Sequence, residues 1–259
     1  MTNNELKNLS KLSQKKFRDI ERKFLIEGKH LIEECIKSEL YKRQIEEIFY
    51  TDTFKDEIYL KNLERLKYPT KYLDMKAFKK MSETKSPQGI LAVINKPLIK
   101  NSIHTPNIIL ALENVNDPGN LGTIIRTAWW FGIEKILLSK NSADIYNSKC
   151  IRATQGGIFN VEVDEDLDLL DSLNSMEKSG YKIILMRLDS NKSLYDFKPN
   201  KNSKYIFVFG NEANGITDEL KNHPRFDALM IPSYTKCESL NLASSVSILC
   251  YHFMFSLEH

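Results

Sequence analysis

The chain has 259 residues, 42% of them hydrophobic and 27% charged, which is enough for one large domain or two modest ones with a buried core. Its longest apolar runs are too short to span a bilayer, no secretion signal is expected, and four scattered cysteines form no CxxC pair, so we expect a cytoplasmic, non-membrane protein with reduced thiols. The net charge of +3 divides unevenly: the first hundred residues hold 22 basic and 15 acidic side chains and the remainder 15 and 19, which suggests a polyanion-binding module, with a lysine-rich solvated surface as the equal alternative.

The first hundred residues are expected to form a small α/β module. Residues 1–16 are polar and should be frayed, whereas apolar positions over 16–37 recur near helical spacing with a break around Gly28. A second helix is predicted over 77–81. The predicted strands are three short runs rich in apolar residues: 45–50, 70–73 and 90–94.

Residues 96–106 have the proline- and asparagine-containing composition of a linker, so the boundary between two domains is placed there. The first domain is expected over 1–98 and the second over 105–256, and the last three residues, 257–259, look like the remnant of a vector-encoded tag.

In the second domain, apolar runs alternate with helical segments. Strands are predicted over 108–113, 135–139, 161–163, 181–186, 205–209 and 228–231. Helices are predicted over 121–131, 166–179 and 240–255. Strands that are apolar on both faces and alternate with helices predict an α/β fold with a parallel sheet covered on both sides.

Three polar or glycine-containing loops, 114–120, 210–215 and 231–241, follow predicted strands. Ligands of open α/β sheets bind at the carboxyl ends of the strands, so these loops are the candidate site. Arg126 follows the first loop on an apolar helix and is expected to have an anionic partner, which Glu212 of the second loop could supply. Ser239 and Asn241 of the third loop have the residue types of helix caps.

The loops contain neither GxGxxG nor a Walker A sequence, and an ordinary nucleotide-binding oxidoreductase is therefore disfavoured. The five histidines form no cluster with the spacing of metal ligands, so no metal site is expected.

Taken in order, the segments NDPGNLGTIIRTA, FVFGNEANGI and MIPSYTKCESLNLASS resemble the three signature motifs of the SpoU (TrmH) family of RNA ribose 2'-O-methyltransferases. The resemblance runs from about Asn107 to the C-terminus and extends to the intermediate segment 152–156. Two N-terminal segments, FLIEGKHLIEECI and SPQGILAVINKP, are similar to the small substrate-binding domain of rRNA-modifying members, a domain that itself resembles kink-turn-binding ribosomal proteins.

The resemblance implies a parallel-sheet catalytic domain with a deep trefoil knot near its C-terminus, preceded by a small α/β RNA-binding domain. It also implies a homodimer that uses S-adenosyl-L-methionine to methylate a ribose 2'-hydroxyl of structured RNA, with rRNA favoured by the extra N-terminal domain. The catalytic residues implied are Asn120, Arg126, Glu212, Ser239 and Asn241. The cofactor-binding residues implied are Gly210, Ile231, Leu240, Thr154 and Gly215.

The family proposal makes Arg126 the base, but a guanidinium stays protonated over the accessible pH range. We therefore expect Arg126 to bind a neighbouring phosphate or to steady the developing alkoxide, with Glu212 and Asn120 orienting it. Trp129 and Trp130 depart from the family pattern. They are expected to be buried in the core or in a dimer contact, with a base-stacking platform as the alternative.

Two other functions remain open at this level. One is methylation of tRNA, and the other is RNA binding by a non-catalytic relative, which the intact set of five candidate catalytic residues disfavours. The sequence predicts neither the nucleotide that is modified nor whether naked RNA or a ribosomal particle is the substrate.

Overall fold

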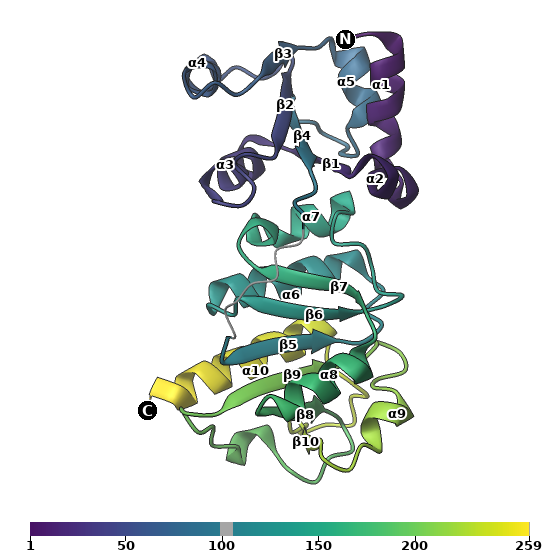
Figure 1. The fold of residues 1–259 in the computed structure, drawn as a ribbon, viewed down its shortest axis with the longest axis vertical. Coiled ribbons are helices and arrows are strands. Elements are labelled where there is room, and N and C mark those ends of the chain that lie inside the picture. Colours follow the sequence, from purple (N-terminus) through teal and green to yellow (C-terminus); the bar gives the residue numbers. More distant parts are fainter. Residues whose placement is uncertain (99–105, 259) are drawn as a thin grey trace. The chain divides into compact units, whose positions relative to one another are not determined.

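The computed structural model describes residues 1–98 and 106–258, except for the side chains of residues 257 and 258 (Figure 1). The expected linker lies largely outside the described residues, as do the side chains of the tag-like tail. The chain forms two compact units: the first contains Met1–Asn101 together with Asp144–Phe159, and the second contains Ser102–Ala143 and Asn160–His259. A division at the linker alone does not anticipate that residues 144–159 pack with the first unit.

The first unit is built on a four-stranded sheet in the order β1-β4-β2-β3, in which β3 pairs parallel to β2 and the other pairs are antiparallel. Its strands are β1 (Lys23–Glu27), β2 (Ile45–Tyr50), β3 (Thr70–Tyr72) and β4 (Ile90–Asn95). Its α-helices are α1 (Asn3–Ser10), α2 (Lys15–Glu21), α3 (Lys29–Lys37), α4 (Glu57–Arg65), α5 (Met75–Met81) and α7 (Ser148–Thr154). The predicted strands over 45–50, 70–73 and 90–94 and the helix over 77–81 are confirmed.

Two expectations for the N-terminus are wrong. The polar start is not frayed: Thr2 and Glu5 form a reciprocal capping box at α1, and Leu6 is buried against the core that α5 also covers. The expected helix over 16–37 is interrupted by β1, in which Phe24 and Ile26 alternate with less buried neighbours and pair with β4. The periods of helix and strand are difficult to separate in so short an apolar run.

Residues 144–159 cover part of the sheet of the first unit. The ring of Tyr146 lies 4.5 Å from that of Phe24, and the ring of Phe159 lies 5.1 Å from that of Tyr41. The hydroxyl of Ser38 donates a hydrogen bond of 2.8 Å to the carbonyl of Phe159. These contacts are buried, so the core of the first unit is complete only when this later segment of the chain is in place.

A buried ion pair fixes the start of the same segment. The Arg18 guanidinium donates to Asp144 Oδ2 over 2.6 and 2.9 Å, and its remaining NH1 group donates to the carbonyls of Leu12 and Ser13 over 2.7 Å. The two charged side chains are only 4% and 7% exposed. Arg18 therefore joins the turn before α2 to the beginning of residues 144–159, which we call the captured segment.

The second unit contains a six-stranded, all-parallel sheet in the order β10-β8-β9-β5-β6-β7 (Figure 1). Its strands are β5 (Ile108–Leu112), β6 (Lys135–Ser139), β7 (Glu162–Leu167), β8 (Tyr181–Met186), β9 (Lys204–Phe209) and β10 (Asp227–Leu229). Its α-helices are α6 (Pro118–Trp130), α8 (Leu169–Lys178), α9 (Asp218–Lys221) and α10 (Leu242–Glu258). The predicted parallel α/β sheet is confirmed.

Helices cover both faces of this sheet. Ile206 and Val208 of β9 pack in one core cluster with Leu173 of α8 and Leu220 of α9. The alternate residue Phe207 faces the other way, and its ring lies 5.0 Å from that of Phe253 on α10. Helix α6 packs beside α10; the first candidate loop leads into α6 and the third into α10.

Of the four cysteines, Cys35, Cys150 and Cys250 are buried and Cys237 is exposed, and none of the four is in a disulfide within the described residues. Burial raises the pKa of the Cys35 and Cys250 thiols to about 12, which keeps both protonated and unreactive at neutral pH. In the described part of the chain, no helix combines the length and apolar character needed to cross a bilayer.

The buried ion pair leads to a test of the coupling between the captured segment and the first unit. Asp144→Ala should lower the free energy of unfolding by about 3–5 kcal/mol, because it leaves the Arg18 guanidinium buried without a counterion. Asp227→Ala, which removes only an exposed pair with Lys192, is the matched control and should leave stability near that of the wild type. Chemical denaturation of the full chain measures both, and equal effects of the two substitutions would contradict the expected role of Asp144.

Candidate active site

The sheet topology brings two of the three candidate loops together. Strands β5 and β9 are neighbours, with Leu112 paired to Phe209, so the loops that follow them start side by side. Asn211 Nδ2 donates a hydrogen bond of 2.7 Å to the carbonyl of Asn114, which ties the second loop to the first. The carboxylate of Glu113 then accepts from the amide and the hydroxyl of Thr217, over 2.9 and 2.7 Å.

A chain of side-chain hydrogen bonds joins all three loops. Asn120 Nδ2 donates to Glu212 Oε1 over 3.0 Å, and Asn120 Oδ1 accepts from Asn241 Nδ2 over 3.0 Å. An amide offers one donor group and one acceptor group, and Asn120 uses each toward a different loop. Among the described hydrogen bonds, the side chain of Asn120 therefore links Glu212 of the second loop to Asn241 of the third.

Local structure holds two of these three residues, Asn120 and Asn241. Asp117 caps α6 and accepts the backbone N–H of Asn120 over 2.8 Å, with Pro118 at the first helical position. Asn241 Oδ1 accepts the backbone N–H of Ser244 over 3.3 Å at the start of α10. The expected capping role of Asn241 is therefore seen in the structure, and the same side chain reaches the first motif.

The second loop has a backbone that only glycine permits at its first position. A Cβ on Gly210 would lie 2.2–2.3 Å from backbone atoms of Gly215 and Ile216, so a larger residue would force the loop open. The two N–H···O bonds between Asn211 and Gly215, each 2.9 Å, close the loop, and Gly215 has a φ of +67°. Asn211 Oδ1 also accepts the amides of Ala213 and Asn214.

Arg126 does not make the contact expected from the sequence. Its side chain is exposed and makes no hydrogen bond or ion pair with another described residue, and Glu212 pairs with Asn120 instead. The distance along the helix explains the difference: Arg126 lies six residues after Asn120, a rise of about 9 Å at 1.5 Å per residue. The guanidinium is therefore left available for a group that comes from outside this chain.

The remaining candidates fall into different surroundings. Ser239 lies in the exposed third loop, where its carbonyl accepts from the Cys237 thiol at 3.5 Å. Thr154 belongs to the first compact unit and is fully buried, and its hydroxyl donates to the carbonyl of Ile151 over 2.7 Å. With its hydroxyl occupied in this way, Thr154 supports the end of α7.

Three backbone positions of the second and third loops have no hydrogen-bond partner among the described residues. Gly210, Ile231 and Leu240 make no backbone hydrogen bond to another described residue, although Gly210 is buried. A buried backbone N–H or C=O without a partner is uncommon and points to a ligand or to water. The side chain of Leu240 is apolar and half-exposed. Small-molecule sites are usually lined by apolar side chains with a few backbone donors and acceptors.

The two tryptophans of α6 are not in the core. Trp129 is 38% exposed and Trp130 is 82% exposed, so burial within the chain, one of the expected locations, is wrong. A dimer contact and a stacking platform both remain compatible with this exposure.

Sequence reasoning did not single out Glu113, Asn114, Asn211 and Thr217, which hold the loops together. Asn114 has a φ of +53°, in the left-handed region that asparagine tolerates better than most residues. The available signal was an asparagine two residues after the end of each of two buried strands, because asparagine both turns the chain and bonds to nearby backbone.

Two protein-family models match the sequence of this chain, one in each half. Residues 107–251 match the SpoU rRNA Methylase family, and residues 3–92 match the MRM3-like substrate binding domain. The chain is 33% identical over 250 residues to the 23S rRNA (guanosine(2553)-2'-O)-methyltransferase RlmP of Bacillus subtilis, and the match covers 96% of each protein.

Two solved structures are similar over nearly the whole chain. A putative RNA methyltransferase of the TrmH family from Porphyromonas gingivalis is 29% identical, with a TM-score of 0.82 and 98% of each chain covered. The AdoMet-bound rRNA methyltransferase from Sinorhizobium meliloti is 25% identical, with a TM-score of 0.80 over 97% of this chain and 94% of its own. With its three motif loops joined through Asn120 and residues 107–251 matched by the family model, the chain belongs to the SpoU rRNA methylase family.

Proposed function

We propose that this protein transfers a methyl group from S-adenosylmethionine to a ribose 2'-hydroxyl of rRNA. The observation that carries the proposal is the hydrogen-bonded set Glu212–Asn120–Asn241, which unites the three family motifs at the carboxyl end of a parallel sheet. RlmP, which acts on the 2'-oxygen of a 23S rRNA guanosine, matches this chain over both units. The MRM3-like substrate binding domain at the N-terminus supports rRNA over tRNA.

The cofactor is assigned to the second and third loops. S-adenosylmethionine supplies a methyl group that its sulfonium has already activated. Gly210, Ile231 and Leu240 would hold the nucleoside through their unpaired backbone groups, and the tight turn closed at Gly215 keeps Gly210 in place. Thr154, whose hydroxyl is bonded within its own helix, has at most an indirect role.

The chain's own residues then serve mainly to orient the RNA. Orientation of reacting groups is worth up to about 7–11 kcal/mol in good intramolecular cases. The exposed guanidinium of Arg126 would bind the phosphate next to the target ribose, because its planar fork matches phosphate oxygens. Ser239 and Asn241 lie at the start of α10, where a hydroxyl and an amide can position the sugar. Glu212 and Asn120 hold Asn241 rather than Arg126.

We also propose a homodimer formed through α6 and α10. These helices pack together, with a 3.3 Å contact between the hydroxyls of Thr127 and Ser247, yet Trp130, Tyr251 and Phe255 on them remain exposed. The rings of Tyr251 and Phe255 stack at 6.1 Å. Large exposed apolar side chains gathered on adjacent helices are typical of a protein interface.

A trefoil knot in the C-terminal region and a cytoplasmic location complete the proposal. The order of strands places β9 between β8 and β5, and the chain leaving β10 is held against the β8–β9 connection through bonds of Met230 to Lys192 and Leu194, 2.9 and 2.7 Å long. The chain then returns to begin α10 beside Asn120. This path supports the knotted arrangement that the family resemblance implies. Ribosomal RNA as the substrate favours the cytoplasm.

Transfer of labelled methyl from S-adenosylmethionine tests the function directly. The acceptors are total rRNA, total tRNA and intact ribosomal subunits, all from a strain that lacks this gene. We expect label in rRNA, free or in subunits, and resistance of the adjacent phosphodiester to alkali, because a methylated 2'-oxygen cannot attack it. Label confined to tRNA would show that tRNA is the substrate instead of rRNA. An alkali-labile product would contradict ribose methylation.

Arg126→Lys tests the orienting role of the guanidinium. We expect the rate of methyl transfer to fall by about a hundredfold, which is the scale for loss of one preorganised donor, because an ammonium lacks the planar fork. Arg225→Lys is the matched control, since Arg225 pairs with Glu177 on the surface, and it should turn over normally. Normal turnover by Arg126→Lys would remove the proposed role.

Trp130→Glu tests the dimer. A charge at this exposed aromatic position on α6 should convert the protein to monomers in sedimentation velocity experiments and abolish methyl transfer. Ile58→Glu on α4 changes another highly exposed apolar side chain, in the first unit, and should leave the dimer intact. A monomeric wild-type protein with full activity would contradict this part of the proposal.

A further inference from the structure

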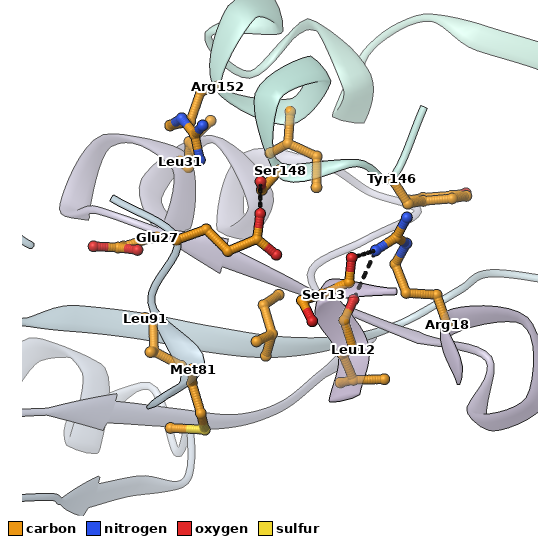
Figure 2. A pocket seen from close by; sticks show the side chains of 13 residues that line it. Leu12, Ser13, Arg18, Glu27, Leu31, Met81, Leu91, Tyr146, Ser148 and Arg152 are labelled. Carbon is orange, nitrogen blue, oxygen red and sulfur yellow. Dashed lines mark hydrogen bonds between the residues drawn. The ribbon is translucent and has the colours of Figure 1, made fainter. Parts of the chain in front are cut away.

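The first unit contains a polar pocket that none of the proposed roles uses. Its volume is about 180 Å³, and its walls come from the turn between β1 and α3, the connection between α5 and β4, and the end of α7. A smaller cavity of about 30 Å³ adjoins it and shares Glu27, Leu31 and Arg152 with it (Figure 2). The pocket thus draws on residues from both family matches, since α7 lies within residues 107–251.

Hydrogen bonds hold the three walls together. The Glu27 carboxylate accepts from the hydroxyls of Ser82 and Thr84 over 2.8 and 2.6 Å. Gln88 Oε1 accepts the backbone N–H of Lys29 over 3.3 Å. The His30 ring donates from Nε2 to the carbonyl of Gln155 over 3.2 Å, which joins α3 to α7. The pocket is therefore a shaped part of the fold, and the negative charge of Glu27 is already engaged.

Other donors that line the pocket are not engaged. Arg152 is half-buried, and its guanidinium makes no hydrogen bond or ion pair with another described residue, Glu27 included. Figure 2 shows Arg152 projecting from α7 above Leu31, apart from the hydrogen bond of Ser148. The Gln88 side-chain N–H groups and the Ser86 hydroxyl are also without a described partner. A partly buried charge normally has a counter-charge, and here none comes from the unit itself.

We propose that this pocket binds one unstacked nucleotide of the RNA, with its phosphate on Arg152 and its sugar or base against His30 and Gln88. The proposal rests on RNA being the substrate. The guanidinium fork matches phosphate oxygens, and a pocket of this size excludes a duplex but admits a group from a single-stranded loop or bulge. Since Arg152 comes from α7, the N-terminal substrate-binding segment forms a complete site only together with residues 144–159.

Binding of total rRNA from the deletion strain to the full-length protein, measured by filter retention at several salt concentrations, tests the proposal. Arg152→Gln should weaken binding about tenfold and reduce the slope of log affinity against log salt by about one, as expected for one lost phosphate contact. Arg65→Gln on α4 removes the same charge from an exposed arginine without a described partner and is the matched control. Equal losses of RNA affinity for the two variants, or no loss for Arg152→Gln, would overturn the proposed role of the pocket in RNA binding.

Cross-linking covers the case in which Arg152→Gln fails to fold. Wild-type protein irradiated with 4-thiouridine-containing rRNA should cross-link within residues 82–88 or 148–155, and cross-links found only elsewhere would overturn the proposal. The two proposals fail separately. Wild-type protein that cross-links in the pocket but transfers no methyl contradicts only the enzymatic function, whereas methyl transfer with normal binding by a folded Arg152→Gln variant contradicts only the pocket.

Discussion

The arrangement of the candidate active site depends on the two-sided hydrogen bonding of a single amide. Asn120 donates to Glu212 and accepts from Asn241, and each bond is 3.0 Å long. Its neighbours in the chain are fixed by the helix cap at Asp117, and its partners by the closed loop at Gly210 and the start of α10. Three segments that are far apart in the sequence therefore meet with little freedom, which is the preorganisation that catalysis by orientation requires.

The parallel sheet makes this meeting possible. Loops after β5 and β9 begin together because those strands are neighbours, and the third loop returns from the edge strand β10 to start α10 at the same place. Hydrogen bonds then hold these loops in a defined conformation: the Glu113 carboxylate accepts from Thr217, and the Asn211 side chain donates to the carbonyl of Asn114. Arg126 is the exception, since no described residue forms a hydrogen bond or ion pair with its side chain, and the proposed contact to an RNA phosphate requires it to be available in this way.

The first unit shows a different form of dependence between distant segments. Residues 144–159 belong in sequence to the methylase region, yet they complete the core of the first unit through Tyr146, Phe159 and the buried Arg18–Asp144 pair. A buried pair is strongly destabilising when only one partner is lost, so the segment and the unit are coupled energetically. The same segment supplies Arg152 to the polar pocket, and RNA bound there would contact both parts of the sequence at once.

The sequence by itself determined the parallel α/β sheet, most strand positions and the three motif loops, because buried strands are continuous apolar runs and their ends carry turn residues. It could not determine β1, since Phe24 to Ile26 fit helix and strand alike until β4 pairs with them. Only the tertiary structure decided that Glu212 contacts Asn120 instead of Arg126, that Trp130 is exposed, and that residues 144–159 join the first unit. Each of these depends on contacts between residues far apart in the chain, and such contacts leave no local period or propensity to read.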